Sequence, residues 1–335
     1  MTNICKFVAL KKYIPSGMPQ NTDFEIKSKE ISIDSEKNIL VSNLWISVDP
    51  YMRARMTERK NYKPPFELGK EMEGYAIGKV ISSNEINFNE GDLVFSNYGM
   101  RDKFVSNAKN LKKINPINIP IQSYLGPLGM TGHTAYMGLL KHGNLKPGQT
   151  VLVSSAGGSV GSTVCQIAKN LGCKVYASTG SDEKVKWLKD ELNVDYAFNY
   201  KKVDNLVLHL KDVCPDGFDL YFDNVGGEFL ESAIFQMKNF GSIVICGRIS
   251  QMNSITPTTG LKNMAHVLVK RLTIKGFIIF DHENEREPFE TEMSKWLLEG
   301  KIKFKETIYE GIESTPNSFI DMLEGKNIGK MLVKI

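Results

Sequence analysis

Length, composition and charge already exclude several classes of protein. The chain has 335 residues, enough for two domains with substantial cores, and its apolar (41%) and charged (24%) fractions are those of an ordinary globular protein. The net charge of +4 comes from 42 basic and 38 acidic side chains spread along the chain, so neither nucleic acid nor an anionic membrane is an expected partner.

The first third of the chain has the pattern of a β-rich domain. Up to about Pro120, short apolar runs such as "KNILVSNLWISV", "GYAIGKVISS" and "GDLVFSNYGMRDKFVS" are punctuated by Gly, Asn and Pro. This pattern predicts a curled or barrel-like sheet. Near Tyr124 it changes, and "GPLGMTGHTAYMGLLKHGNLKPGQ" predicts a helix that ends at a Gly/Pro turn.

Strands and helices then alternate. The expected strands are "TVLVSSA", "KVYASTG", "YAFNY", "FDLYFDNVG" and "SIVICG", and "STVCQIAKNLG", "SDEKVKWLKDELN" and "FLESAIFQMKNFG" are expected helices. The alternation indicates a mainly parallel sheet with helices on both faces. "LTIKGFIIF" reads as one more buried strand, "TEMSKWLLEGKI" as a helix, and the tail as a helix, a Gly-rich turn and a last strand. We therefore expect an α/β protein of two domains, with a ligand cleft between them.

A glycine-rich turn follows the first strand of this alternating region. In "SAGGSVGS" (residues 155–162) the glycines allow a tight turn and let backbone N–H groups approach a pyrophosphate at the start of the next helix. The spacing is one glycine short of G-x-G-x-x-G, so the prediction depends on the strand before the turn and the helix and strand after it. A purely structural strand-to-helix turn is the alternative.

The end of the second strand indicates which dinucleotide is bound. An NAD site would place Asp or Glu there, on the ribose 2′-hydroxyl, but the chain has Thr179 and Gly180. Small residues leave room for a 2′-phosphate, and Lys184 can contact it with its charge. Asp182 and Glu183 are the objection, but behind Ser181 as a cap they suit the first turn of a helix. The pattern favours NADPH over NADH.

The cysteines and the N-terminus favour a cytoplasmic protein. The five cysteines are odd in number and never spaced as Cys-x-x-Cys, which argues against a disulfide framework or a structural zinc lobe. No apolar run approaches 18 residues, and the first residues lack the pattern of a secretory signal. We expect a soluble cytoplasmic protein without a membrane span.

Several motifs together resemble one family. They are "VDPYMRARM", "GPLGMTGHTAY", the glycine loop, "GSDEK", "FNYK", "FDNVGGE", "ICGRIS" and "GKNIGK", and they occur in family order over nearly the whole length. The chain resembles the zinc-independent medium-chain dehydrogenase/reductases, in the branch of 2-alkenal reductases, plant double-bond reductases and prostaglandin reductases (leukotriene hydroxydehydrogenases). Where zinc-dependent relatives read G-H-E-x-x-G, this chain has Lys70, and its histidines are scattered, so no metal site is expected.

The resemblance implies the fold and the cofactor site. Residues 1–122 and 305–335 would form a GroES-like β-rich catalytic domain, and residues 123–304 a doubly wound Rossmann domain that binds NADP. Implied cofactor contacts are Gly158, Ser159, Val160 and Gly161 on the pyrophosphate, Lys184 and Tyr200 on the 2′-phosphate, Met130 and Thr134 near the nicotinamide, and Asn224, Cys246, Gly247, Arg248, Ile249, Ser250, Gln251, Met252, Phe277, Ile278, Ile279 and Asn327 elsewhere in the site. Tyr200 read alone could be a strand-end aromatic, and Asn224 and Asn327 could be turn residues.

The implied reaction is NADPH-dependent reduction of the C=C bond of an α,β-unsaturated aldehyde or ketone, such as a 2-alkenal or a 15-oxoprostaglandin-like substrate, without a metal. Many relatives carry a tyrosine in the loop after "CG-x-IS", but this chain has Met252, whose thioether cannot donate a hydrogen bond. Tyr51 is then the preferred substrate contact, although it could be a core aromatic. The nicotinamide ribose and water are other candidate proton donors. Arg53 and Arg55 are expected to be structural.

Two other functions fit the same residues. A quinone oxidoreductase would share the fold and NADPH but act on quinones. An NADPH-binding redox sensor with little turnover would bind the cofactor without consuming it. We also expect a homodimer formed through Rossmann-domain edge strands such as "LTIKGFIIF", because relatives pair in this way.

Overall fold

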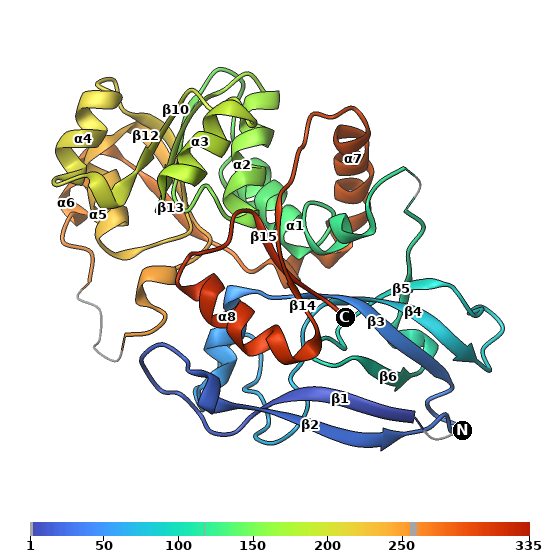
Figure 1. The fold of residues 1–335 in the computed structure, drawn as a ribbon. Helices are drawn as coiled ribbons and strands as arrows, with labels where there is room; N and C mark the ends of the chain where they lie inside the picture. The colour runs from blue at the N-terminus through green and yellow to red at the C-terminus, as the bar shows by residue number, and fades with distance from the viewer. Residues whose placement is uncertain (1–2, 117, 255–259) are drawn as a thin grey trace. The chain divides into compact units, whose positions relative to one another are not determined.

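The computed structural model describes residues 3–116, 118–254 and 260–335. The chain divides into two compact units, one of residues 1–125 with 306–335 and the other of residues 126–305. They are called unit 1 and unit 2 below, and Figure 1 shows the course of the chain through both. Among the described residues no helix has the length and apolar character needed to cross a bilayer.

Unit 1 is β-rich, as predicted, and is completed by the end of the chain. Its main sheet has the order β14-β15-β3-β4-β5-β7, with β6 also pairing with β3, and β1 and β2 form a separate antiparallel pair. Its elements are β1 (Asn3–Leu10), β2 (Phe24–Ile31), β3 (Ile39–Ser47), β4 (Ala76–Ser83), β5 (Leu93–Ser96), β6 (Lys103–Ser106), β7 (Lys112–Lys113), β14 (Glu306–Glu310), α8 (Thr315–Leu323) and β15 (Lys330–Lys334). β15 pairs antiparallel with β3, with Val333 opposite Ile46. The C-terminal tail is therefore an integral part of the N-terminal sheet.

A buried ion pair joins this tail to the segment that follows β3. The ammonium group of Lys330 donates to the carboxylate of Asp49 at 3.0 Å and to the carbonyl oxygens of Val48 and Met331. Lys330 and Asp49 are 3% and 1% exposed, and burial lowers the pKa of Lys330. All three ammonium donors are thus used, which is what a buried charge requires.

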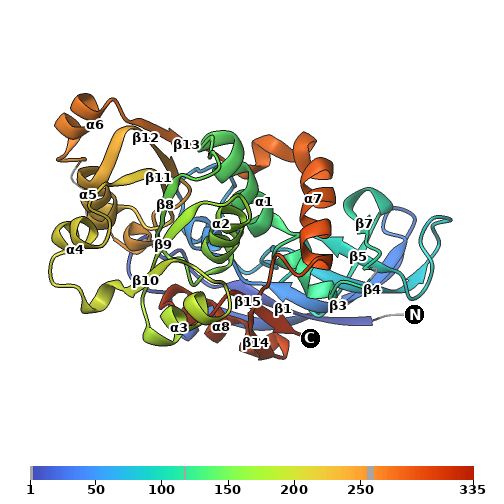
Figure 2. The ribbon, with the colours of Figure 1, turned by 90° about the horizontal axis from the view of Figure 1, so that it is seen from above.

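Unit 2 is a parallel sheet with helices on both faces. Its strand order is β10-β9-β8-β11-β12-β13: β9 and β10 lie on one side of β8, and β11 to β13 lie on the other, so the strand order reverses between β8 and β11. The elements are α1 (Met130–Tyr136), β8 (Thr150–Val153), α2 (Ser159–Asn170), β9 (Lys174–Thr179), α3 (Asp182–Asp190), β10 (Tyr196–Asn199), α4 (Leu206–Val213), β11 (Phe218–Asp223), α5 (Gly227–Gln236), β12 (Met237–Ile245), α6 (Met264–Lys270), β13 (Thr273–Gly276) and α7 (Arg286–Leu298). Figure 2 shows α4 and α5 on one side of the sheet and α1 and α2 on the other. Ligands of doubly wound sheets bind outside the carboxyl ends of the strands at such a reversal.

Two sequence-based expectations about this sheet are wrong. The stretch "LTIKGFIIF" is not a buried strand: only Thr273–Gly276 forms a strand, and this strand, β13, is a largely exposed edge of the sheet. The predicted helix "FLESAIFQMKNFG" ends at Gln236, and the residues after it belong to β12. In both cases an apolar run could not reveal on its own whether neighbouring elements cover it.

Candidate functional site

The glycine loop lies between β8 and α2, at the reversal of strand order. Gly158 is the N-cap residue of α2, and no acidic side chain lies in the first turn of that helix. A Cβ atom built on Gly161 would lie 2.5 Å from the backbone oxygen of Ser155, so only glycine fits there. The free N–H groups and positive dipole at the start of this 12-residue helix suit a pyrophosphate.

The next loop gathers basic and aromatic side chains around two glycines. A Cβ on Gly157 would lie 2.8 Å from Cδ of Lys184, and one on Gly180 would lie 3.4 Å from both Cε of Lys201 and a ring carbon of Tyr200. The stem of Lys184 therefore crosses the glycine loop, while Tyr200 and Lys201 lie against the end of β9. The structure brings together the residues predicted to bind the 2′-phosphate and adds Lys201 to them.

The electrostatics of this cluster suit an anion. Lys184 is only 7% exposed, and its pKa is lowered by burial and by the nearby positive charge of Lys201. One dianionic phosphate would stabilise the charged form of Lys184 and would also attract the ammonium group of Lys201. Lys201 was not among the predicted contacts, although it lies in the "FNYK" motif, because a Lys-Lys pair is usually an exposed polar surface.

One of the two carboxylates that argued against NADPH, that of Asp182, is engaged elsewhere. Ser181 caps α3 as predicted, with its hydroxyl accepting from the backbone N–H of Lys184 at 3.4 Å. The carboxylate of Asp182 accepts from Lys202 at 2.5 Å and from Asn199 at 3.0 Å, and these bonds lower its pKa. Asp182 is therefore part of the polar surface at the start of α3.

The carboxyl end of β11 carries a second turn of the site. The side-chain amide of Asn224 donates to the backbone oxygen of Ser154 at 2.7 Å, which ties the ends of β8 and β11 together. The predicted segment Cys246–Met252 follows β12 and is held back onto this turn, since Ile249 N donates to Asn224 O and Ser250 Oγ donates to Val225 O. These predicted residues thus line up along the carboxyl ends of adjacent strands.

Two further predicted segments of unit 2 lie on α1 and directly after β13. Thr134 donates its hydroxyl hydrogen to the backbone oxygen of Met130, four residues earlier on α1, so both lie on one half-exposed face of that helix. Ser159 at the start of α2 donates to Thr131 of α1 at 2.7 Å, so this face begins beside the glycine loop. The segment 277–279 follows directly after β13, at the carboxyl end of the sheet's edge strand.

The remaining predicted residues belong to unit 1. Tyr51 lies on a 3-10 helix, Pro50–Met56, and its hydroxyl is buried with no hydrogen-bond partner among the described residues. Asn327 lies in the turn before β15, where its amide donates to the backbone oxygen of Gly329. Arg53 donates to the carbonyl oxygens of Ile14 and Gly17, which is a structural role.

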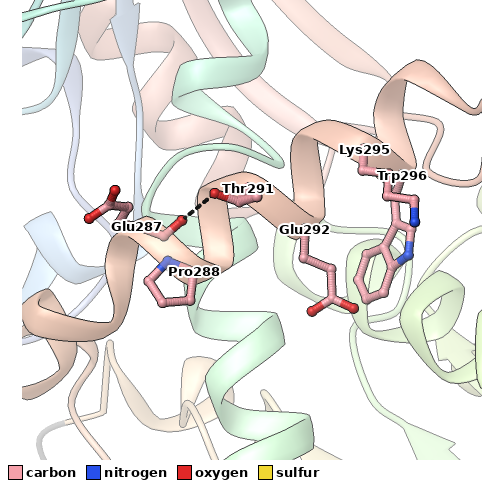
Figure 3. A pocket seen from close by; sticks show the side chains of 6 residues that line it. All are labelled: Glu287, Pro288, Thr291, Glu292, Lys295 and Trp296. Carbon is pink, nitrogen blue, oxygen red and sulfur yellow. Dashed lines mark hydrogen bonds between the residues drawn. The ribbon is translucent and has the colours of Figure 1, made fainter.

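Two other features contribute nothing to a cofactor site. A shallow pocket on α7, drawn in Figure 3, is lined by Glu287, Pro288, Thr291, Glu292, Lys295 and Trp296 and contains none of the predicted residues. In the described part of the chain, no three or more His, Cys, Asp or Glu residues are grouped so that they could hold a metal ion. Lys70, at the zinc-ligand position of zinc-dependent relatives, is exposed and lies 3.8 Å from Glu67.

The residues present fit NADPH rather than NADH. The backbone at the start of α2 would hold the pyrophosphate, and Lys184, Lys201 and Tyr200 would hold the 2′-phosphate. The geometry that favours NADPH is the approach of Lys184 to the glycine loop and of Lys201 and Tyr200 to Gly180 at the end of β9, where a 2′-phosphate would bring a compensating negative charge.

Comparison with known proteins supports this assignment. The family described as "N-terminal domain of oxidoreductase" matches residues 6–114, and the one described as "Zinc-binding dehydrogenase" matches residues 159–299. Prostaglandin reductase 1 of Bos taurus is 42% identical over 329 residues, which cover 97% of each chain. The NADP(+)-dependent 2-alkenal reductase of Nicotiana tabacum is 38% identical over 335 residues, covering 98% of this chain and 97% of the relative.

A solved structure agrees with these relatives. CurA from Vibrio vulnificus, in complex with NADPH, aligns with 98% of this chain at a TM-score of 0.91 and 36% identity, and 98% of that chain is covered. Full-length matches at this level of identity establish common descent for both units. The chain therefore belongs to the zinc-independent medium-chain dehydrogenase/reductases, in the branch of NADP-dependent 2-alkenal and prostaglandin reductases.

Proposed function

We propose that this enzyme uses NADPH to reduce the C=C bond of α,β-unsaturated aldehydes and ketones. The observation that carries the proposal is the Lys184, Lys201 and Tyr200 cluster, which selects a 2′-phosphorylated dinucleotide, in a chain whose relatives are named as reductases of such substrates. The acceptors would be 2-alkenals or oxidised prostaglandin-like enones.

The chemistry divides between the cofactor and the protein. When bound, NADPH supplies a hydride. Its addition to the β-carbon of the substrate forms a C–H bond, moves the C=C electron pair toward the carbonyl carbon and leaves negative charge on the carbonyl oxygen; a proton from solvent then completes the α-carbon. The protein's own part is to align the two reactants and to stabilise that oxygen.

We assign roles to the predicted residues on the same basis. Backbone groups from Gly158 to Gly161 would hold the pyrophosphate, and Met130 and Thr134 on α1 would contact the nicotinamide. Tyr51, with its buried hydroxyl, would donate a hydrogen bond to the substrate carbonyl. Asn224, Asn327 and the segments 246–252 and 277–279 would complete the cofactor site, with Asn224 and Asn327 acting through the turns that they brace.

The test follows NADPH absorbance with 2-nonenal, with NADH in parallel and a Met252→Tyr variant beside the wild type. Rapid loss of NADPH with little loss of NADH supports the proposal and shows that Met252 is compatible with turnover. Faster turnover with a quinone than with any enal or enone would favour the quinone oxidoreductase. If NADPH binds but is not consumed with any enal, enone or quinone, the redox sensor becomes the better hypothesis.

We also propose a cytoplasmic homodimer that pairs through the β13 edge of unit 2. Apolar side chains near this edge support it: Phe240, Leu268 and Val269 are 71%, 77% and 65% exposed, which is unusual for large apolar residues near one sheet edge. All five cysteines are free thiols, which suits a reducing compartment. Gel filtration that shows only a monomer would refute the dimer.

A further inference from the structure

A lysine that has no predicted role lies over two tyrosine rings of unit 1, one of them that of Tyr51. Lys63 lies in the loop between the 3-10 helix Pro50–Met56 and β4. Its ammonium nitrogen lies 5.4 Å from the ring centre of Tyr51 and 5.5 Å from that of Tyr75. Both distances fall within the range of a cation–π interaction, so two ring faces hold one positive charge.

The cluster is held in place by its surroundings. Tyr75 stacks on Phe95, with ring centres 5.2 Å apart and planes at 25°. Arg55 donates to the backbone oxygen of Pro64, next to Lys63, at 2.8 Å and to the carboxylate of Glu73 at 2.8 Å. One buried guanidinium therefore fixes both chain segments that carry Lys63 and Tyr75, which is the kind of support that a preorganised site needs.

The hydroxyl of Tyr51 adds a hydrogen-bond donor to this cluster. It is buried and has no partner among the described residues, a state that costs free energy unless a ligand supplies an acceptor. Burial and the negative charge of Asp49 hold the pKa of Tyr51 above its usual range, so it keeps its proton at neutral pH. The cluster thus combines one O–H donor and one cation.

From this geometry we infer that Lys63 is a catalytic residue that stabilises the negative charge on the substrate's carbonyl oxygen, with Tyr51 donating to the same oxygen. The inference rests on the proposed reduction of enals and enones. Hydride addition at the β-carbon leaves an enolate, and a nearby ammonium lowers the energy of that charge far more than it lowers the energy of the neutral substrate. Lys63 itself keeps its protons, and the α-carbon takes its proton from solvent.

The residue at position 252 is consistent with this role. A methionine there provides no hydrogen-bond donor, so the negative charge must be met by other groups. The ammonium group of Lys63 would stabilise this charge by electrostatic attraction.

The test compares Lys63→Met and Lys63→Arg with the wild type, and Lys70→Met serves as a control that removes an exposed lysine from the next segment of the chain. We expect Lys63→Met to lower kcat/KM for 2-nonenal by about 10- to 100-fold, mostly in kcat. NADPH affinity should stay unchanged, Lys63→Arg should recover most of the loss, and Lys70→Met should match the wild type. Wild-type turnover that survives Lys63→Met within about twofold would overturn the inference.

A binding measurement separates this inference from the proposed reaction. Nonanoate carries a stable negative charge where the enolate would carry one, whereas nonanol is a neutral compound of the same length. With NADP(+) bound, we expect Lys63→Met to weaken nonanoate binding by about tenfold and to leave nonanol binding unchanged. If the wild type reduces no enal, the proposed function fails, but Lys63-dependent nonanoate binding would still support the anion site. Nonanoate binding that is independent of Lys63 would overturn it.

Discussion

Removing the ammonium group of Lys184 should separate the affinity for NADPH from the affinity for NADH. Lys184→Met keeps the apolar stem that crosses Gly157 and deletes only the charge. A hydrogen bond to a charged group contributes about 1.5–3 kcal/mol, so the Kd for NADPH should rise roughly 10- to 150-fold. NADH has no 2′-phosphate, and its affinity should change by less than about twofold.

Without cofactor, Lys184→Met should not lower the stability of the protein. Burial and the charge of Lys201 lower the pKa of Lys184, which means that the charged form is disfavoured before the cofactor binds. The variant should therefore be at least as stable as the wild type without cofactor. With saturating NADPH, a 100-fold weaker Kd should remove about 2.7 kcal/mol of ligand-induced stabilisation.

Fluorescence titration with each dinucleotide and thermal unfolding with and without NADPH would measure both effects. Lys202→Met is the matched control, because Lys202 is an exposed lysine next to Lys201 that pairs with Asp182. Equal losses of NADPH and NADH affinity in Lys184→Met, or an equal loss in the control, would refute the assignment of the 2′-phosphate site.

Three further predictions concern other parts of the site. Gly161→Ala should abolish measurable NADPH binding, because its Cβ would lie 2.5 Å from the backbone oxygen of Ser155, whereas Gly158→Ala meets that atom only at 3.4 Å and should fold normally; circular dichroism and titration would check both. His133 is fully buried and burial lowers its pKa to about 4, below its unfolded value, so the unfolded chain binds more protons and stability should fall as the pH drops from about 6.5 toward 4. Denaturant unfolding should show a loss of about 2 kcal/mol at pH 5 that His133→Phe largely removes; an unchanged pH dependence would contradict this. Tyr51→Phe deletes a buried hydroxyl without a described partner, so it should slow turnover yet leave the free energy of unfolding unchanged or about 1 kcal/mol higher; a marked loss of stability would make Tyr51 a structural residue.

The sequence predicted the elements of the site better than the contacts between them. Alternating apolar runs and the cap at Ser181 were enough to predict strands, helices and the glycine loop, because these depend on neighbours in the chain. Lys201 was missed and "LTIKGFIIF" was misread because both depend on neighbours in space. A second lysine becomes part of a site only when Gly180 brings it beside Lys184, and an apolar run becomes an edge strand only when no strand follows it in the sheet.

The surroundings of Tyr51 could not be predicted from the sequence either. The motif "VDPYMRARM" marked the segment, but the sequence could not show that the hydroxyl would be buried or that Lys63, twelve residues later, would lie over its ring. Arg55 decides this geometry, since its guanidinium holds the loop after Lys63 at Pro64. Such a bond between a side chain and a distant carbonyl oxygen leaves no periodic signal in the sequence.

One buried carboxylate explains how the cofactor loops can be ordered before NADPH binds. Asp223, at the end of β11, accepts from the hydroxyl of Tyr221 at 2.6 Å and from the backbone N–H groups of Val225 and Gly226 at 2.9 and 2.8 Å. Gly226 adopts a φ of 68°, a conformation that most residues avoid, and these bonds hold it there. The core fixes this turn, and the turn holds Asn224 and the segment after β12 in place. Cofactor binding therefore does not have to supply the free energy needed to order them. The selectivity for NADPH can then depend on the few charged contacts at the end of β9.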